Sequence, residues 1–307
     1  MPEYLACGNI MMDVIESNDG TFSHPSLGGP AFFALEGIRL FTEDCALVCQ
    51  AGADFESTYS HWMQRNTVSE QYVRISADHC SQHILKYNED GSGNFTCRSR
   101  YGEELLGYLK TTPEHIDVAA HGTKGIYLAQ NTDKVFWSKL DKVKHRHGFK
   151  MMWEIEATTI EEDLMDRARE VIHLADMWSV NLNEATGLFK IPIQNEEDIL
   201  NEIMKLPVEL TLLRVGARGA YTVTGNTAVF CEAIDITDTV DPTGCGNCST
   251  AAAMYAHVAG YEPRMVVAMA NVAAGYNAAQ FGVYPHITSE VMKDALALAT
   301  SFSEKIM

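Results

Sequence analysis

Basic residues are scarce in this sequence, and this scarcity limits the partners to be expected. The chain has 307 residues, with 23 lysines and arginines against 41 aspartates and glutamates and a formal net charge of −18. Such a diffuse negative field disfavours nucleic acid and anionic membrane surfaces as partners. A phosphate ligand stays compatible with it, because backbone N–H groups and a few cations can hold an anion locally.

Long apolar runs are also missing. No uninterrupted apolar stretch reaches the roughly 18 residues of a membrane span. The sequence begins MPEYLACGNIMMDV, without basic residues ahead of the apolar ones, so we expect no signal peptide and a cytoplasmic location. The eight cysteines are scattered without a disulfide framework, which indicates reduced, mostly buried thiols.

Two of these cysteines, Cys245 and Cys248, have the C-x-x-C spacing of thiol redox enzymes. A thioredoxin-like fold needs only about a third of this length and places its motif after an early strand. We therefore interpret Cys245 as a loop residue and Cys248 as a residue that faces the core from a helix.

Neither an internal repeat nor a Pro/Ser-rich linker is present, so we expect a single domain over residues 1–307. Apolar strand-like runs alternate with amphipathic helical stretches along most of the chain. This alternation predicts an α/β fold, a mostly parallel sheet sandwiched by helices. The expected strands include residues 4–10, 45–51, 125–129, 150–154, 177–180 and 210–215.

Two segments break this alternation. Residues 14–22 and 83–101 alternate polar and apolar side chains around turn signals rich in Asn, Asp and Gly. Period-two patterns with such turns are typical of antiparallel hairpins. We expect them to form a small β-layer beside the main sheet that acts as a lid over a ligand.

The stretch TVDPTGCGNCSTAAAMYAHV has the pattern of a glycine turn between an apolar run that Val240 closes and a helix. Gly244 and Gly246 allow positive φ and close approach of a ligand to the backbone. The N–H groups at a helix N-terminus lie at the positive end of the helix dipole and bind anions. The pattern is compatible with an anion site or with an ordinary strand–turn–helix connection.

Residues 241–247, Asp-Pro-Thr-Gly-Cys-Gly-Asn, resemble the Asp-Thr-x-Gly-Ala-Gly-Asp signature of the ribokinase-like (PfkB) carbohydrate kinases. The resemblance extends over nearly the whole chain and implies a Rossmann-like sheet, a β-lid and ATP-dependent phosphorylation of a small hydroxylated molecule. The other segments that resemble family motifs follow in the family's order: GNIMMD at 8–13, LGGPA at 27–31, NLNE at 181–184, VGARGA at 215–220 and ANVAA at 270–274.

The resemblance also implies a substrate site. Asn9 and Asp13, at the first strand, would bind hydroxyl groups of a sugar. Gly28 and Gly29 would let the substrate lie against the backbone. Gln130 is a further candidate contact because it lies just past an expected strand.

A nucleotide site follows from the same resemblance. Asn181 and Glu184 would organise magnesium and the phosphates, with Glu184 holding the ion through water. The other expected nucleotide contacts are Arg214, Gly216, Gly219 and Asn271, the last on the adenine side.

The signature itself would carry the chemistry. Backbone N–H groups of Gly244, Cys245 and Gly246 would form an anion hole for the moving phosphoryl group. Asp241 resembles a family residue near a monovalent-cation site, where potassium would bind. An aspartate that simply caps a turn is the alternative.

Three residues depart from the family pattern. Asn247 stands where the catalytic Asp accepts the proton of the substrate hydroxyl, and Pro30 replaces an Asn after the paired glycines. Arg214 stands where a Thr is common, so a guanidinium is expected to contact the phosphate there.

Glu154 and Glu156 flank Ile155 after a strand and either face the cleft or solvate the strand end; we favour the cleft.

Two functions remain open. The first is an ATP-dependent kinase for a sugar or similar polyol, since phosphoryl transfer depends mainly on positioning and charge neutralisation. The second is a non-catalytic ligand sensor of the same fold, because the Asn247 amide cannot take a proton at neutral pH. For a kinase, Asn247→Asp is expected to raise kcat at least about tenfold. An exposed lid edge would favour a homodimer paired through the lid.

Overall fold

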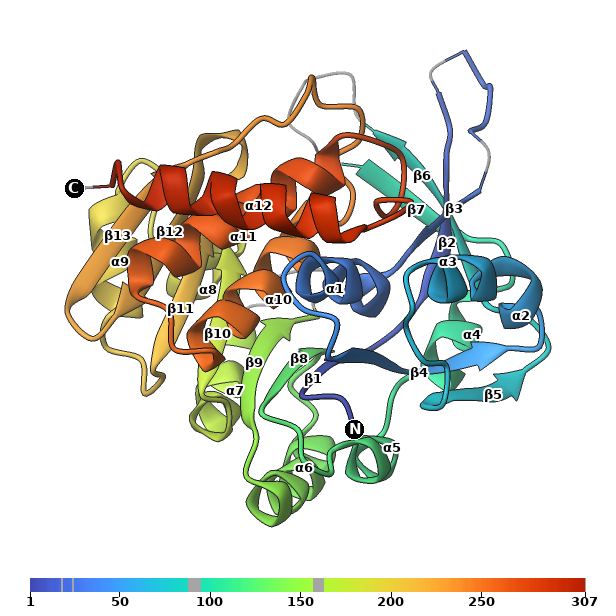
Figure 1. Ribbon diagram of the computed structural model, residues 1–307. Coiled ribbons are helices and arrows are strands. Elements are labelled where there is room, and N and C mark those ends of the chain that lie inside the picture. The colour runs from blue at the N-terminus through green and yellow to red at the C-terminus, as the bar shows by residue number, and fades with distance from the viewer. Residues whose placement is uncertain (18, 24, 88–94, 157–162, 307) are drawn as a thin grey trace.

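The computed structural model describes residues 1–17, 19–23, 25–87, 95–156 and 163–306, which build a nine-stranded central sheet (Figure 1). Pairing is parallel from β5 to β11, and the remaining edge is antiparallel. The expected, mostly parallel sheet is therefore confirmed. In spatial order its strands are β13 (Thr227–Glu232), β12 (Gly219–Thr224), β11 (Leu210–Arg214), β10 (Met177–Asn181), β9 (Lys150–Ile155), β8 (Gly125–Gln130), β1 (Tyr4–Cys7), β4 (Cys45–Gly52) and β5 (Val73–Ala77).

Helices cover both faces of the sheet, and each face has its own apolar core. One core includes α1 (Pro30–Arg39), α2 (Phe55–Thr58), α3 (Ser60–Arg65), α10 (Cys245–Val258), α11 (Pro263–Ala278) and α12 (Ser289–Ser303). The other includes α5 (Pro113–Ala119), α6 (Lys134–His147), α7 (Leu164–Val171), α8 (Leu182–Phe189) and α9 (Glu196–Ile203). Shorter helical segments are α4 (Glu103–Tyr108) and two 3₁₀ turns, Ile172–Leu174 and Gly216–Arg218.

Side chains of the central strands alternate between the two cores. In β9, Met151 and Trp153 belong to the core that includes α5–α9, and Met152 belongs to the core that includes α10. Because successive side chains of a strand point to opposite faces, Glu154 lies on the α10 face. Both faces of β9 are covered by helices. The Glu154 carboxylate therefore points at a helix and not at solvent.

A second sheet of four strands lies to one side of the first within the described residues (Figure 1). Its pairings β2–β3 and β6–β7 are antiparallel, as expected, whereas β2 and β6 pair in parallel and join the two hairpins. The turn signal of the second hairpin falls in residues 88–94, outside the described residues. The strands are, in order, β3 (Ser26–Gly28), β2 (Met11–Ile15), β6 (Ser81–Tyr87) and β7 (Phe95–Ser99).

One expectation about the glycine turn is wrong. Val240 does not close a strand: β13 ends at Glu232, and residues 233–244 connect it to α10 without a strand. Val240 is 48% exposed, and its N–H donates to the Ala278 carbonyl at 2.8 Å. The loop is therefore held by α11 and not by a strand. Across the described residues, no helix is both long and apolar enough to cross a bilayer.

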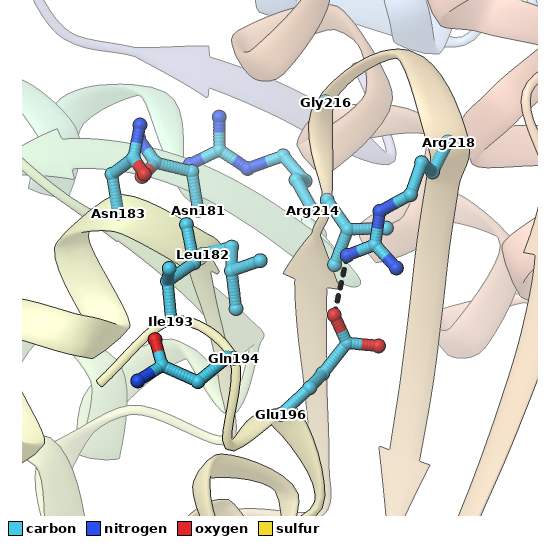
Figure 2. Close-up of a pocket in the computed structure, with 10 residues that line it drawn as sticks. Asn181, Leu182, Asn183, Ile193, Gln194, Glu196, Arg214, Gly216 and Arg218 are labelled. Atoms are coloured by element: carbon cyan, nitrogen blue, oxygen red, sulfur yellow. Dashed lines mark hydrogen bonds and ion pairs between the residues drawn. The ribbon is translucent and has the colours of Figure 1, made fainter. Parts of the chain in front are cut away.

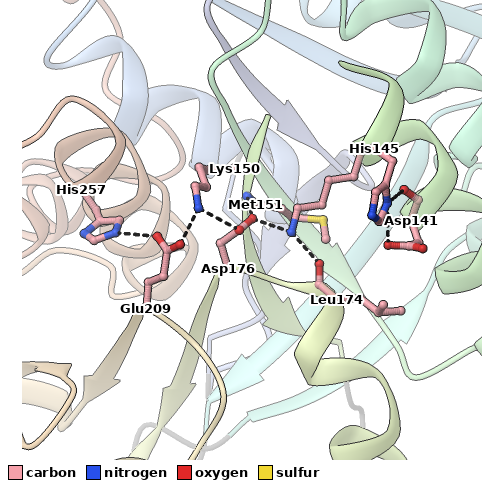
Figure 3. A network of polar contacts seen from close by, with 9 residues as sticks. Asp141, His145, Lys150, Met151, Leu174, Asp176, Glu209 and His257 are labelled. Atoms are coloured by element: carbon pink, nitrogen blue, oxygen red, sulfur yellow. Dashed lines mark hydrogen bonds and ion pairs between the residues drawn. The ribbon is translucent and has the colours of Figure 1, made fainter. Parts of the chain in front are cut away.

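An ionic network joins the amino ends of β9, β10 and β11, opposite the edge where the candidate site lies (Figure 3). Asp176 accepts from the Met151 N–H at 2.8 Å and pairs with Lys144 at 2.7 Å and Lys150 at 3.2 Å. Its side chain is only 12% exposed, whereas Glu209, which also pairs with Lys150, is 48% exposed.

We expect Asp176→Asn to lower the free energy of unfolding by about 2–4 kcal/mol, because two lysines and a backbone N–H lose a buried charged partner. Glu209→Gln, at the exposed end of the same network, should cost less than about 1 kcal/mol. Urea denaturation of both variants measures the difference. Equal losses would show that burial does not determine which of these ion pairs stabilise the fold.

Candidate active site

The candidate residues meet at the carboxyl ends of the parallel strands. Gln130, Asn181 and Arg214 are the last residues of β8, β10 and β11. Glu154 is the last but one of β9, and Asn9 follows β1. Open α/β sheets bind their ligands at this edge, so the topology brings together residues far apart in sequence.

Helix α10 begins directly over this edge. Gly244 caps it with φ 85°, and a Cβ there would collide with the buried Phe33 ring, so only glycine fits. The Cys245 N–H donates to the Pro242 carbonyl at 3.2 Å, and its expected place among the anion-hole donors stays a prediction. The N–H groups of Gly246 and Asn247 belong to the first turn, where a helix leaves donors unpaired.

Asn247 is fixed by two acceptors beneath it. Its Nδ2 donates to the Tyr127 hydroxyl at 3.0 Å and to Glu154 Oε2 at 3.1 Å. The Tyr127 hydroxyl in turn donates to Glu154 Oε2 at 2.7 Å. Because both amide hydrogens are used, the half-buried Asn247 side chain can offer a ligand only its amide oxygen, Oδ1.

Arg214 pairs with the same carboxylate. Its Nη2 lies 2.8 Å from Glu154 Oε1 and 3.8 Å from Glu184 Oε2. Burial alone would lower the pKa of Arg214, but the Glu154 and Glu184 carboxylates outweigh burial and raise it. A Cβ on Gly246 would collide with the guanidinium, so Arg214 lies against the first turn of α10. Its Nε is buried without a hydrogen-bond partner.

The Asn-x-x-Glu motif closes the start of α8. Asn181 Oδ1 accepts from the Glu184 N–H, and Glu184 Oε2 accepts from the Asn181 N–H, both at 2.8 Å. This reciprocal capping box fixes both side chains. Burial raises the pKa of Glu184, with Arg214 acting in the opposite direction.

Two cavities adjoin at this edge and share Asn181, Arg214 and Gly216. The larger, about 670 Å³, lies between α8 and the end of β11; Figure 2 shows Asn181 and Arg218 on opposite sides of it, with Arg218 paired to Glu196. The smaller, about 350 Å³, is lined by other expected nucleotide residues, including Gly219, Gly246 and Asn271. The Asn271 amide donates to the Cys231 and Glu232 carbonyls at 2.8 Å, which ties α11 to β13.

The expected substrate residues are nearly buried. Asn9, Asp13 and Gln130 are 4%, 4% and 6% exposed. A Cβ on Gly28 would collide with the Asp13 carboxylate and press on the Phe33 ring, so Gly28, which lies beside Asp13, and the loop before α10 adjoin the same aromatic side chain. Phe33 thus links the substrate residues to Gly244.

Asn9 and Gln130 meet through Glu156, a neighbour of Glu154. Asn9 Nδ2 donates to Glu156 Oε1 at 3.3 Å, and the Glu156 N–H donates to the Gln130 carbonyl at 3.0 Å. Gly29 is the N-cap of α1, and a Cβ on it would collide with the backbone of Ile10 and Met11. The structure therefore brings Asn9, Gln130 and Glu156 together, and their role as substrate contacts stays a prediction.

Asp241 has a turn-forming role. Its Oδ1 accepts from the Thr243 N–H at 3.0 Å and from the Thr243 hydroxyl at 2.7 Å. This favours the turn alternative for that oxygen, while a monovalent cation beside Asp241 stays a prediction. Burial, and secondarily Asp241, raises the pKa of Asp13 from 3.8 to about 8.

The C-x-x-C thiols face the protein interior. Cys245 Sγ and Cys248 Sγ each lie 3.4 Å from a carbonyl oxygen of α11. Burial raises the pKa of Cys245 to about 11 and also raises the pKa of Cys248. The thiolate that redox chemistry requires is therefore disfavoured, in line with the sequence-based interpretation.

Comparison with known proteins identifies the family. The profile described as pfkB family carbohydrate kinase matches residues 3–289. The chain belongs to this family. No sequence among the curated proteins matches it.

Solved structures of kinases share the fold. A nucleoside kinase from Burkholderia thailandensis, in complex with inosine, has a TM-score of 0.74 at 17% identity over 97% of each chain. A putative ribokinase II from E. coli, in complex with ATP and Mg²⁺, has a TM-score of 0.75 at 14% identity over 99% of this chain and 100% of that one. An adenosine kinase from Sinorhizobium meliloti reaches 0.74 at 17%, over 96% and 98%.

Sequence reasoning missed Tyr127 and Phe33 as parts of the site. Both lie within apolar runs and look like ordinary core residues, so no local signal marks them. Glu154 could be found, because a carboxylate near the carboxyl end of a buried parallel strand is unusual.

The raised pKa of Asp13 makes a testable prediction. Between pH 3.8 and about 8 the folded protein keeps a proton on Asp13 that the unfolded chain has released, so this group lowers stability as the pH rises. The loss is up to about 1.4 kcal/mol per pH unit. Asp13→Asn removes it, so its Tm should match the wild type near pH 4 and exceed it at pH 8.

The control is Asp294→Asn, an exposed aspartate of α12. Thermal unfolding of both variants across this pH range tests the assignment. A Tm difference for Asp13→Asn that does not grow with pH would show that the carboxyl is not held protonated.

Proposed function

We propose that this PfkB family protein is an ATP-dependent kinase that phosphorylates a hydroxyl group of a sugar or similar polyol. One observation carries the proposal: the first turn of α10 separates the nucleotide-side cavities from the substrate residues. Gly246 borders the smaller cavity, and Gly244 lies against the Phe33 ring, which also adjoins Gly28 beside Asp13. A phosphoryl group bound at this turn would face an acceptor on the other side.

The residues at this turn fit a phosphate. A helix N-terminus attracts anions through its N–H groups and its dipole. Arg214 adds a guanidinium whose Nε is buried without a partner, and a buried orphan donor implies a ligand that the fold alone does not supply. Guanidinium groups bind phosphate oxygens in a fixed fork geometry.

Candidate residues for the nucleotide and its metal lie on the cavity side of the first turn of α10. Gly216, Gly219 and Asn271 line the cavity that would take the nucleotide, and Glu184 would hold magnesium through water. Magnesium, when bound, neutralises charge on the phosphate oxygens. The E. coli kinase that shares the fold was solved with ATP and Mg²⁺, which supports both assignments.

The acceptor is the less defined partner. Asn9, Asp13 and Gln130 offer amide and carboxyl groups, which suit hydroxyls of a sugar, alone or within a nucleoside. Kinases of the same fold are described as nucleoside and sugar kinases, which supports this class. We propose a cytoplasmic location. We also propose that any homodimer of this protein pairs through the small sheet.

A ligand sensor is the alternative, and Asn247 favours it. The amide cannot take up the acceptor proton at neutral pH. A sensor would bind nucleotide and small molecule without turnover.

A coupled ADP-release screen over sugars, nucleosides and inositols decides between them. The kinase proposal expects acceptor-dependent ADP release with at least one compound, and a parallel Asp13→Ala preparation should lose it, which excludes a contaminating kinase. ATP-analogue binding without release across the whole screen would favour the sensor.

Glu184→Gln tests the metal assignment. Gln still closes a capping box at this position, so the fold should be kept. We expect the affinity for a non-hydrolysable ATP analogue to fall about 10- to 100-fold in magnesium and to stay unchanged in EDTA. Calorimetric titration measures both. An equal loss in EDTA would show that Glu184 shapes the cavity without serving the metal.

The small sheet, with its adjoining segments 14–22 and 83–101, is proposed as a lid. Its amides should exchange hydrogen more slowly once an accepted substrate binds, because closure excludes water. Hydrogen exchange followed by mass spectrometry, with α12 as an internal reference, measures this. Unchanged exchange in the sheet at saturating substrate would rule out a lid.

A further inference from the structure

The proposed function needs a group that takes the proton of the acceptor hydroxyl. Asn247 stands at the expected place but has no basic atom, and both of its amide hydrogens are bound beneath it. One of the two acceptors is itself a carboxylate, Glu154. The carboxylate that is missing at position 247 is therefore present in Glu154, whose Oε2 lies 3.1 Å from Asn247 Nδ2.

Glu154 also borders the phosphate-binding turn. Its Oε1 lies 3.7 Å from the point where a Cβ on Gly246 would stand. Its strand places it on the α10 face, paired in register with Ala129 of β8 and Ser179 of β10. The Glu154 side chain is 8% exposed.

We propose that Glu154 is the catalytic carboxylate of this site and that Asn247, whose Nδ2 donates to it, positions that carboxylate. The inference rests on the proposed kinase function. The acceptor oxygen forms a bond to the γ-phosphorus, the bond from that phosphorus to the bridging oxygen breaks, and ADP leaves with the electron pair. The hydroxyl proton moves to the Glu154 carboxylate.

Arg214 keeps this carboxylate occupied until phosphate arrives. In the present arrangement its Nη2 pairs with Glu154 Oε1 at 2.8 Å, and its Nη1 side lies on Gly246. A phosphate bound at the turn competes for the same guanidinium, because it carries more charge and fits the same fork. Transfer of Arg214 from Glu154 to phosphate frees the carboxylate when the acceptor is to be deprotonated.

The same geometry explains the amide at position 247. A carboxylate there would lie about as close to Glu154 as the amide nitrogen does now, and two carboxylates at that separation cannot both ionise. With Glu154 in place, an amide satisfies the contact and an aspartate does not. The sequence-based expectation that Asn247→Asp raises kcat is therefore reversed: we now expect no increase.

A carboxylate-exchange experiment tests the proposal. The variants are Glu154→Gln, Asn247→Asp and the double variant, with Glu209→Gln as the matched control at the opposite end of the sheet. Glu154→Gln leaves the buried Arg214 without its charged partner and could therefore fail to fold. The double variant returns a carboxylate to the site, so it keeps the proposal testable in that case. Each is assayed with the acceptor found in the screen, and each is titrated with a non-hydrolysable ATP analogue and magnesium.

We expect Glu154→Gln to lower kcat about 10²- to 10⁴-fold. It should bind the ATP analogue at least as tightly as the wild type, because Arg214 loses a competitor. The double variant should regain at least about tenfold of the lost rate, and Glu209→Gln should match the wild type. A residue with only a structural role would not separate analogue binding from turnover in this way.

The proposal is overturned if Glu154→Gln keeps kcat within about twofold, if the double variant is no faster than Glu154→Gln, or if Asn247→Asp alone raises kcat tenfold. These outcomes leave the kinase function intact, since the wild type remains active. A wild type that binds the analogue but transfers phosphoryl to no acceptor overturns the proposed function and this inference together.

Discussion

The buried ion pair between Glu154 and Arg214 is the interaction on which the rest of the site depends. It joins β9 to β11 beneath the first turn of α10, and Asn247 reaches it from that turn. An ion pair taken out of water stabilises a fold only when further hydrogen bonds satisfy its remaining atoms. Tyr127 and Asn247 supply those bonds on Glu154, whereas the Nε of Arg214 stays unpaired. This unpaired donor supports the proposed anion site.

The sheet determines where this pair can form. Parallel strands β8 to β11 end at one edge, and strict alternation of their side chains places Tyr127, Glu154 and Arg214 on the face that α10 covers. Packing of α10 on that face then brings the glycines of its first turn against Arg214 and Phe33. A bulkier residue at Gly244 or Gly246 would push the helix away from the strands, so the glycines serve packing as well as ligand approach.

Much of the fold could be predicted from the sequence, because buried parallel strands are continuous apolar runs and the helices between them are periodic. Strands β12 and β13 were not predicted, and a strand was expected to end at Val240, where the structure has none. Their pairing depends on tertiary contacts such as the bond from Val240 to Ala278, which leave no local pattern. The site residues were predictable where a motif carries them, as in Asn181 and Glu184. The contacts of Glu154 required the register of the sheet.

In the proposed mechanism, Arg214 exchanges the Glu154 carboxylate for the phosphate of a nucleotide bound at the first turn of α10. A crystal structure with magnesium and a non-hydrolysable ATP analogue tests it directly. The account predicts a terminal phosphate within hydrogen-bond distance of the Gly246 or Asn247 N–H and of Arg214, with Glu154 separated from the guanidinium. A nucleotide bound elsewhere, or a phosphate at the turn with Arg214 still paired to Glu154, would contradict it.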